Sequence, residues 1–202
     1  MSLYQTQIRN FAVTLATALL LAGSASAQSN VNPHTKIRIN NFGRIDDHYY
    51  RGAQPETGDY ADLASFGIKT VIDLTQDGRA DEQRLVQLSG MNFYRIPLTT
   101  SDRPSDAAVA QFLKLVKDPA NWPVYVHCQG GRHRTGVMTA VYRMTQDGWS
   151  ADRAYQEMKL YHFEGFPGHP VLKRFVYDYP VKSNQERQAN TLSNENAVGL
   201  SK

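Results

Sequence analysis

One segment of the chain, residues 124–136, combines residue types that together can bind and attack an anion. Its sequence, VYVHCQGGRHRTG, contains the only cysteine, Cys128, and places Arg134 beyond five intervening residues. A turn with Gly130 and Gly131 can wrap its backbone N–H groups around one centre, which makes an anion-binding nest. The fork of an arginine fits two oxygens of a tetrahedral phosphate. The segment therefore predicts a phosphate-binding loop.

The cysteine in this loop is expected to ionise readily. A helix predicted to begin near Thr135 directs its positive end and its unpaired N–H groups toward the same centre. That potential lowers the pKa of a thiol below the free value of about 8.5, and the thiolate is the nucleophilic form. Most lone cysteines are small buried hydrophobes instead. Here the neighbouring residues favour the nucleophile, so the predicted reaction is hydrolysis of a phosphate monoester, with no metal and no other cofactor.

The string HCxxGxxRTG, which begins at His127, resembles the signature loop of the protein tyrosine phosphatase superfamily. The segments FGRIDDHYYRGAQP and GIKTVIDL are similar to compact dual-specificity phosphatases, particularly the atypical plant-and-fungal-like branch, and the resemblance covers residues 42–179. It implies a covalent phosphocysteine on Cys128 and oxyanion binding by Arg134 and the loop amides. It also implies that Thr135 donates a hydrogen bond to the sulfur and that His127 braces the loop from behind.

The other loop residues are predicted to contact the substrate: Gln129, Gly130, Gly131, Arg132 and His133. The resemblance extends to GRHRTG, which is similar to the GKHRTG of the atypical branch. Arg132 and His133 are expected to add positive charge, and two interpretations stay open. The charge steers a substrate with several phosphates, or it forms a polar rim that only tunes the cysteine. The expected partner is a phosphorylated protein or a polyphosphorylated small molecule, at a shallow, permissive site.

A phosphatase of this kind needs a general acid to protonate the departing ester oxygen. The resemblance implies an aspartate from a loop upstream of the cysteine, and Asp102 lies in the middle of such a loop. Asp102 is the predicted acid. Asp106 is expected in the first turn of the next helix, where it complements the helix dipole, and it is the second choice. Asp73 on an interior strand and Asp77 in a turn are expected to be structural.

The elements that must position this loop alternate along the chain. We expect strands over 42–45, 49–51, 69–74, 92–96 and 124–127, and helices over 57–66, 81–89, 105–116, 135–146, 150–160 and 171–177. Such alternation predicts an α/β fold, a single domain with a central, mostly parallel sheet flanked by helices. Thr57, Ser105 and Ser150 are expected to cap their helices. Arg51, with Gly52 and Gln54, could reach the active face, but an arginine at the edge of a hairpin is more often a solvated surface charge, and that is the expectation.

The two ends of the chain are predicted to lie outside this domain. Residues 1–27 read as a secretory signal peptide, with an apolar run of twelve residues from Phe11 and a cleavage site after Ala27. Twelve residues are too few to cross a bilayer, which takes about 20, so no stable membrane insertion is expected. The predicted order is an arm over 28–41, a phosphatase domain over 42–180 and a flexible tail over 181–202. The expected location is secreted or periplasmic.

Composition excludes some classes of function. The chain has 202 residues, 41% of them hydrophobic, and a formal net charge of only +3, which gives no support for a nucleic-acid binder. His162 and His169 lack partners at metal-ligand spacing, so no metal site is expected. Two alternatives to the phosphatase stay open. A rhodanese-like sulfurtransferase is disfavoured by the RTG ending and the upstream aspartate, and a non-catalytic phosphate-binding module by the presence of both Cys128 and Arg134.

Overall fold

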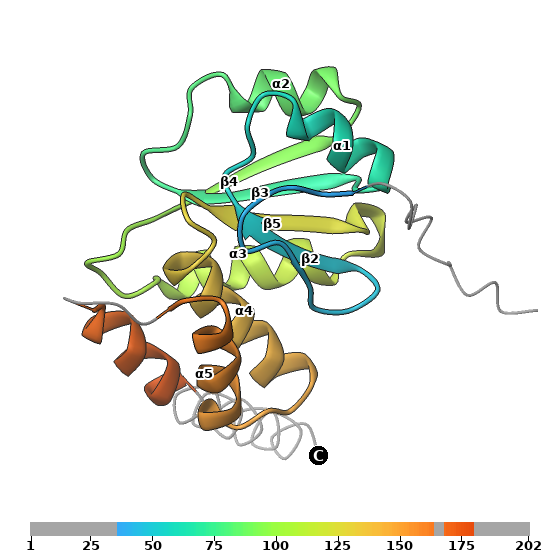
Figure 1. Cartoon of the computed structure of the whole chain (residues 1–202). Helices are drawn as coiled ribbons and strands as arrows, with labels where there is room; N and C mark the ends of the chain where they lie inside the picture. The colour runs from blue at the N-terminus through green and yellow to red at the C-terminus, as the bar shows by residue number, and fades with distance from the viewer. Residues whose placement is uncertain (1–35, 164–167, 180–202) are drawn as a thin grey trace, which may run out of the picture.

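The computed structural model describes residues 36–163 and 168–179 (Figure 1). The predicted signal peptide over 1–27, the first residues of the predicted arm and the predicted tail over 181–202 lie outside the described residues. Within the described part of the chain, no helix is both long enough and apolar enough to span a membrane.

A five-stranded sheet forms the centre of the domain, in the order β1-β2-β5-β3-β4. The strands are β1 (Gly43–Arg44), β2 (Tyr49–Ala53), β3 (Thr70–Thr75), β4 (Asn92–Leu98) and β5 (Val124–Cys128). Only β1 is antiparallel to its neighbour, and the other pairings are parallel. The residues of β2, β3 and β5 are all buried, as expected for parallel strands covered on both faces. The predicted mostly parallel sheet is confirmed.

Helices cover both faces of this sheet (Figure 1). They are α1 (Asp59–Phe66), α2 (Glu82–Leu88), α3 (Asp106–Lys117), α4 (His133–Gln146) and α5 (Ala151–Leu160), with a 3-10 turn η1 (Pro119–Asn121) and a further helix over 170–179. One apolar cluster joins α1 and α2 to the sheet, and a second, larger cluster joins α3, α4 and α5 to the opposite face. The two clusters make a three-layer α/β domain.

Two of the three predicted helix caps are present. Ser105 and Ser150 each accept a hydrogen bond from the backbone N–H three residues further on. The prediction for Thr57 is wrong, because α1 begins only at Asp59. The hydroxyl of Thr57 instead accepts a hydrogen bond from Arg79, 3.3 Å away. A contact with a residue 22 positions away is not visible in local sequence.

The parallel strands determine where the chemistry can occur. Their carboxyl ends meet at one edge of the sheet, which is where open α/β folds bind ligands. Cys128 ends β5 at this edge, Thr75 ends β3 and Leu98 ends β4. The loops that follow these three strands therefore face one another.

Candidate active site

The loop between β5 and α4 connects the predicted nucleophile to the predicted arginine. Cys128 is 2% exposed, and α4 begins at His133, earlier than predicted, so that Arg134 and Thr135 lie in its first turn. Gly131 has a φ of +63°, and a Cβ there would clash with the backbone of Gly52 on β2. A glycine is needed at this position both for the left-handed conformation and for the close approach.

Three consecutive carbonyl groups of this loop accept hydrogen bonds from outside it. The backbone N–H of Gln54 donates to the carbonyl of Gln129 (3.2 Å), and Nδ2 of Asn41 donates to that of Gly130 (2.8 Å). Nη2 of Arg51 donates to the carbonyl of Gly131. All three donors come from the segment that enters and leaves β2. Since the carbonyls are engaged on the outer side, the loop N–H groups turn inward, which is the arrangement of an anion nest.

The inward-facing donors act on the sulfur of Cys128. Burial alone would raise the pKa of this thiol, but the hydroxyl and amide of Thr135, the charge of Arg134 and the amide of Arg132 outweigh burial and lower it. The buried Thr135 hydroxyl has no other partner among the described residues. It is therefore available to the thiolate, and the sulfur is held in its nucleophilic form.

Arg134 projects from α4 over the same centre and meets an acidic side chain there. Its Nη1 lies 3.3 Å from Oδ1 of Asp77 and 3.3 Å from the carbonyl oxygen of Leu98. The Arg134 side chain is 9% exposed and that of Asp77 is 81% exposed. Asp77 lies in a turn, as expected, but its place is not only structural, because its carboxylate contacts Arg134 and lines the cavity. Asp77 follows β3 at the carboxyl edge of the sheet. This position is the signal in the sequence that could have identified Asp77 as a residue of the site.

The loops after β3, β4 and β5 enclose a cavity of about 740 Å³ in front of Cys128. Its lining comprises Gln76, Asp77, residues 98–101, residues 128–130, residues 132–134 and His169. The lining includes most of the predicted substrate-binding loop, but Gly131 is turned away toward β2. A cavity of this volume admits a phosphorylated side chain or a small organic phosphate.

Asp102, the predicted general acid, lies beside the cavity rather than in its lining. Its Oδ2 accepts hydrogen bonds from the hydroxyls of Thr99 (2.7 Å) and Ser101 (3.0 Å), both of which do line it. These two hydrogen bonds lower the pKa of Asp102. Asp106 is the first residue of α3, the helix position predicted for it.

His133 and His169 meet in the lining of the cavity, with their ring centroids 3.9 Å apart. Burial, together with the neighbouring His169, lowers the pKa of His133 to about 4. His133 is therefore neutral at pH 7, and the expectation that it adds positive charge to the loop is wrong. Arg132 keeps that role.

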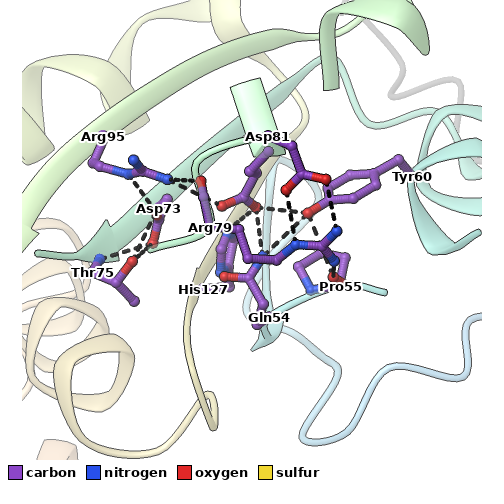
Figure 2. A network of polar contacts seen from close by, with 10 residues as sticks. Gln54, Pro55, Tyr60, Asp73, Thr75, Arg79, Asp81, Arg95 and His127 are labelled. Carbon is purple, nitrogen blue, oxygen red and sulfur yellow. Dashed lines mark hydrogen bonds and ion pairs between the residues drawn. The ribbon is translucent and has the colours of Figure 1, made fainter. Parts of the chain in front are cut away.

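His127 belongs to a buried polar network (Figure 2). This network lies on the face of β5 opposite to Cys128, because neighbouring side chains on a strand alternate between its two faces. Its Nε2 lies 2.9 Å from Oε1 of Glu82 on α2, and both side chains are fully buried. Burial alone would lower the pKa of His127, but the Glu82 carboxylate raises it. Glu82 also accepts hydrogen bonds from Gln54 (2.8 Å) and Tyr60 (3.0 Å). His127 thus ties the strand that ends in Cys128 to α2.

The same network contains three residues that could in principle hold a cation. Asp73, Glu82 and His127 each place one ligand atom within 4.8 Å of the others. However, Arg95 lies 2.7 Å from the Asp73 carboxylate and 3.6 Å from that of Glu82. Its guanidinium already supplies the positive charge that a metal would bring, so the cluster is a buried ion-pair network (Figure 2).

A sulfur nucleophile presented to a bound tetrahedral anion is the chemistry of the cysteine-dependent phosphatases. The family described as "DSP-PTPase phosphatase fused to NAD+ Kinase" matches residues 25–169. The chain belongs to this family of phosphatases, and the resemblance inferred from the loop is confirmed.

Individual relatives agree with this assignment. The dual specificity protein phosphatase TpbA of Pseudomonas aeruginosa strain UCBPP-PA14 is 30% identical over 149 residues, which is 70% of this chain and 66% of TpbA. The chain spans 53% of TpbA from a second strain. The inositol diphosphatase DSP2 of Oryza sativa subsp. japonica is 24% identical over 148 residues, 71% of each chain. A crystal structure of a P. aeruginosa TpbA variant with phosphotyrosine has a TM-score of 0.58 at 25% identity, covering 76% of this chain and 91% of that one.

Proposed function

We propose that this phosphatase hydrolyses phosphate monoesters through a phosphocysteine intermediate on Cys128. In the first step the sulfur forms a bond to phosphorus while the ester P–O bond breaks, and the departing oxygen takes a proton from the general acid. In the second step water forms a bond to phosphorus, gives up a proton to the same group, and the thiolate leaves. Arg134 and the loop amides hold the equatorial oxygens throughout.

The observation that carries this proposal is that Cys128, at the end of β5, and Arg134, in the first turn of α4, line one cavity, where the surrounding donors lower the pKa of the thiol. Fixed donors and a guanidinium neutralise the phosphoryl charge, so the reaction needs no metal. The test is hydrolysis of p-nitrophenyl phosphate in the presence of EDTA. The wild-type chain is expected to turn over under these conditions and Cys128→Ser is expected to be inactive. Activity that survives Cys128→Ser, or that requires an added metal, would overturn the proposal.

The general acid of this proposal is Asp102. Its loop is adjacent to the cavity, and the residues that hold its carboxylate, Thr99 and Ser101, line that cavity. A bound ester that displaces these hydroxyls would release the carboxylate toward the leaving oxygen and would remove the two hydrogen bonds that lower its pKa. Asp102→Asn tests this role, and Asp106→Asn, on the first turn of α3, serves as the matched comparison.

The substrate proposed first is a protein that carries phosphotyrosine. The relative TpbA is a dual specificity protein phosphatase, and a TpbA variant has been solved with phosphotyrosine. A polyphosphorylated inositol is the second candidate, because Arg132 adds a cation to the lining beside Arg134 and because DSP2 is an inositol diphosphatase. A panel of phosphotyrosine peptides and inositol diphosphates decides between them through kcat/KM. Loss of activity in Arg132→Gln on the inositol substrate alone would favour the second.

We also propose that the enzyme acts outside the cytoplasm. The proposal is supported by the apolar run and the small-residue cleavage site within residues 1–27. Expression of the full chain in a bacterial host, followed by N-terminal sequencing of the periplasmic fraction, tests it. The expected mature chain begins at Gln28. An uncleaved chain that stays in the cytoplasmic fraction would contradict the proposal.

A further inference from the structure

Arg51 is a buried cation directly beneath the catalytic loop, and the expectation that it is a solvated surface charge is wrong. Its side chain is 0% exposed. Nη2 donates to the Gly131 carbonyl, and Cζ lies 3.9 Å from the centroid of the Tyr161 ring. Nε and Nη1 are buried with no hydrogen-bond partner among the described residues. Burying a guanidinium whose donors lack partners costs free energy. We therefore expect the positive charge of Arg51 to have a role in the site.

The groups that face Arg51 leave one anion for it to stabilise. Burial lowers the pKa of Arg51, and Tyr49 from its own strand, Tyr161 and Glu157 from the α5 side, and Cys128 from β5 partly offset this. Burial raises the pKa of Tyr49, so it offers Arg51 no anion, and Tyr161 contacts the guanidinium with its ring face. The carboxylate of Glu157 is already 2.7 Å from Arg143. No salt bridge to Arg51 is found in the described part of the chain, so the thiolate of Cys128 is the remaining anion near Arg51 that its charge can stabilise.

The sheet register places this charge and the sulfur on one face. β2 and β5 are parallel, with Arg51 beside Val126 and Ala53 beside Cys128. Because side chains alternate along a strand, Arg51 and Cys128 project to the same side of the sheet. Arg51 therefore lies on the same side of the sheet as the sulfur and contacts the loop at Gly131, outside the cavity lining, whereas Arg134 is part of that lining.

We propose that Arg51 is a positioning residue of the phosphatase site, which holds the Gly131 carbonyl outward and supplies a second, permanent positive charge to the thiolate of Cys128. The two arginines then divide the work. Arg134 turns its guanidinium to the phosphoryl oxygens when substrate binds, and Arg51, which cannot reach the cavity, keeps the sulfur ionised at that moment. This inference rests on the proposed function, since a thiolate is needed only if Cys128 is the nucleophile.

The test is the pH dependence of alkylation of Cys128, the only thiol, by iodoacetamide in the folded full-length protein. Iodoacetamide is uncharged, so Arg134 does not concentrate it. Arg51→Met removes the charge and keeps an unbranched apolar stem. We expect the midpoint of the alkylation profile to rise by about one pH unit, as for loss of one nearby opposite charge. The rate at pH values below the midpoint then falls roughly tenfold. Arg51→Lys keeps the charge and is expected to recover most of the shift.

Two controls separate charge from loop geometry. Arg44→Met removes an exposed arginine from the same hairpin and is expected to leave the midpoint unchanged. Asn41→Gly removes the neutral hydrogen bond to Gly130 and keeps the left-handed backbone at that position (φ +54°), so it is expected to move the midpoint much less than Arg51→Met. Thermal melts of each variant verify that the thiol is titrated in folded protein.

The possible results point in different directions. The role of Arg51 would be overturned if Arg51→Met alkylates with the same midpoint as the wild-type chain. It would also be overturned if Asn41→Gly shifts the midpoint as much as Arg51→Met does. If the wild-type chain itself alkylates with the midpoint of a free cysteine, the proposed function fails instead. Should Arg51→Met not fold, Arg51→Lys decides, because a shift as large as that of complete charge loss would contradict the proposal.

Discussion

The contact between Asp77 and Arg134 predicts that one carboxylate weakens the binding of every oxyanion to this enzyme. Before phosphate can bind to the guanidinium of Arg134, the contact between its Nη1 and Oδ1 of Asp77, which are 3.3 Å apart, must break. The phosphate also enters next to a negative charge. Asp77→Asn removes both obstacles, because an asparagine keeps the size of the side chain without its charge.

The magnitude follows from exposure. The Asp77 side chain is 81% exposed, so solvent screens the pair, and pairs of this kind are worth about 0.2–1 kcal/mol. Losing both the pairing and the repulsion then strengthens orthophosphate binding by about 1 kcal/mol, which is roughly a fivefold lower inhibition constant. The gain shrinks as salt is added, because salt screens exposed charges.

The assay is competitive inhibition by orthophosphate of p-nitrophenyl phosphate hydrolysis at low ionic strength. Asp81→Asn is the matched control, since Asp81 is an exposed aspartate four residues away that pairs with Arg79 instead (3.1 Å). We expect Asp77→Asn alone to lower the inhibition constant. Equal inhibition constants for wild type and Asp77→Asn would refute the assignment of Asp77 to the phosphate site, and weaker binding in the variant would reverse its role.

Two further predictions concern the acid and the buried network. Asp102→Asn is expected to lower kcat by roughly 10²–10⁴ on substrates with a poor leaving group and far less on p-nitrophenyl phosphate, and an equal loss on both would exclude the acid role. Glu82→Gln is expected to lower the free energy of unfolding by about 3–5 kcal/mol, because it leaves His127 buried without its carboxylate. The folded pKa of Glu82 is lowered and that of His127 is raised. The Glu82 contribution is therefore lost as the pH falls through its folded pKa, and the His127 contribution as the pH rises through its own. Urea melts between pH 4 and 9 should show a wild-type advantage that is largest in between, and a pH-independent difference would contradict this account.

The predictions that succeeded depended on local patterns. The order of residues from His127 to Gly136 specifies a strand, a tight turn and a helix, and these are the elements found. The hydroxyls of Ser105 and Ser150 marked helix starts because capping involves only the next turn. The alternation of strands and helices was enough to predict a parallel sheet.

The residues that were misjudged act across long distances in the sequence. Arg51 reaches Gly131 in the loop that follows the neighbouring strand β5, and a hairpin position alone carries no sign that a parallel strand will cover it. The glycine beside Asp77 predicts a turn, whereas the place of Asp77 after β3 puts it at the same sheet edge as Cys128. His133 lost its charge to burial and to His169, and neither effect is visible in the loop sequence. Charge, burial and contact at these positions are properties of the assembled fold.

The account depends most directly on a covalent bond between phosphorus and the sulfur of Cys128. Rapid acid quench during turnover, followed by peptide mass mapping, measures this bond. The predicted result is a phosphoryl group on the peptide that contains Cys128, at higher occupancy in Asp102→Ala, where the group that activates water is missing. Turnover with no phosphoryl group on that peptide, or with one on another residue, would contradict the account.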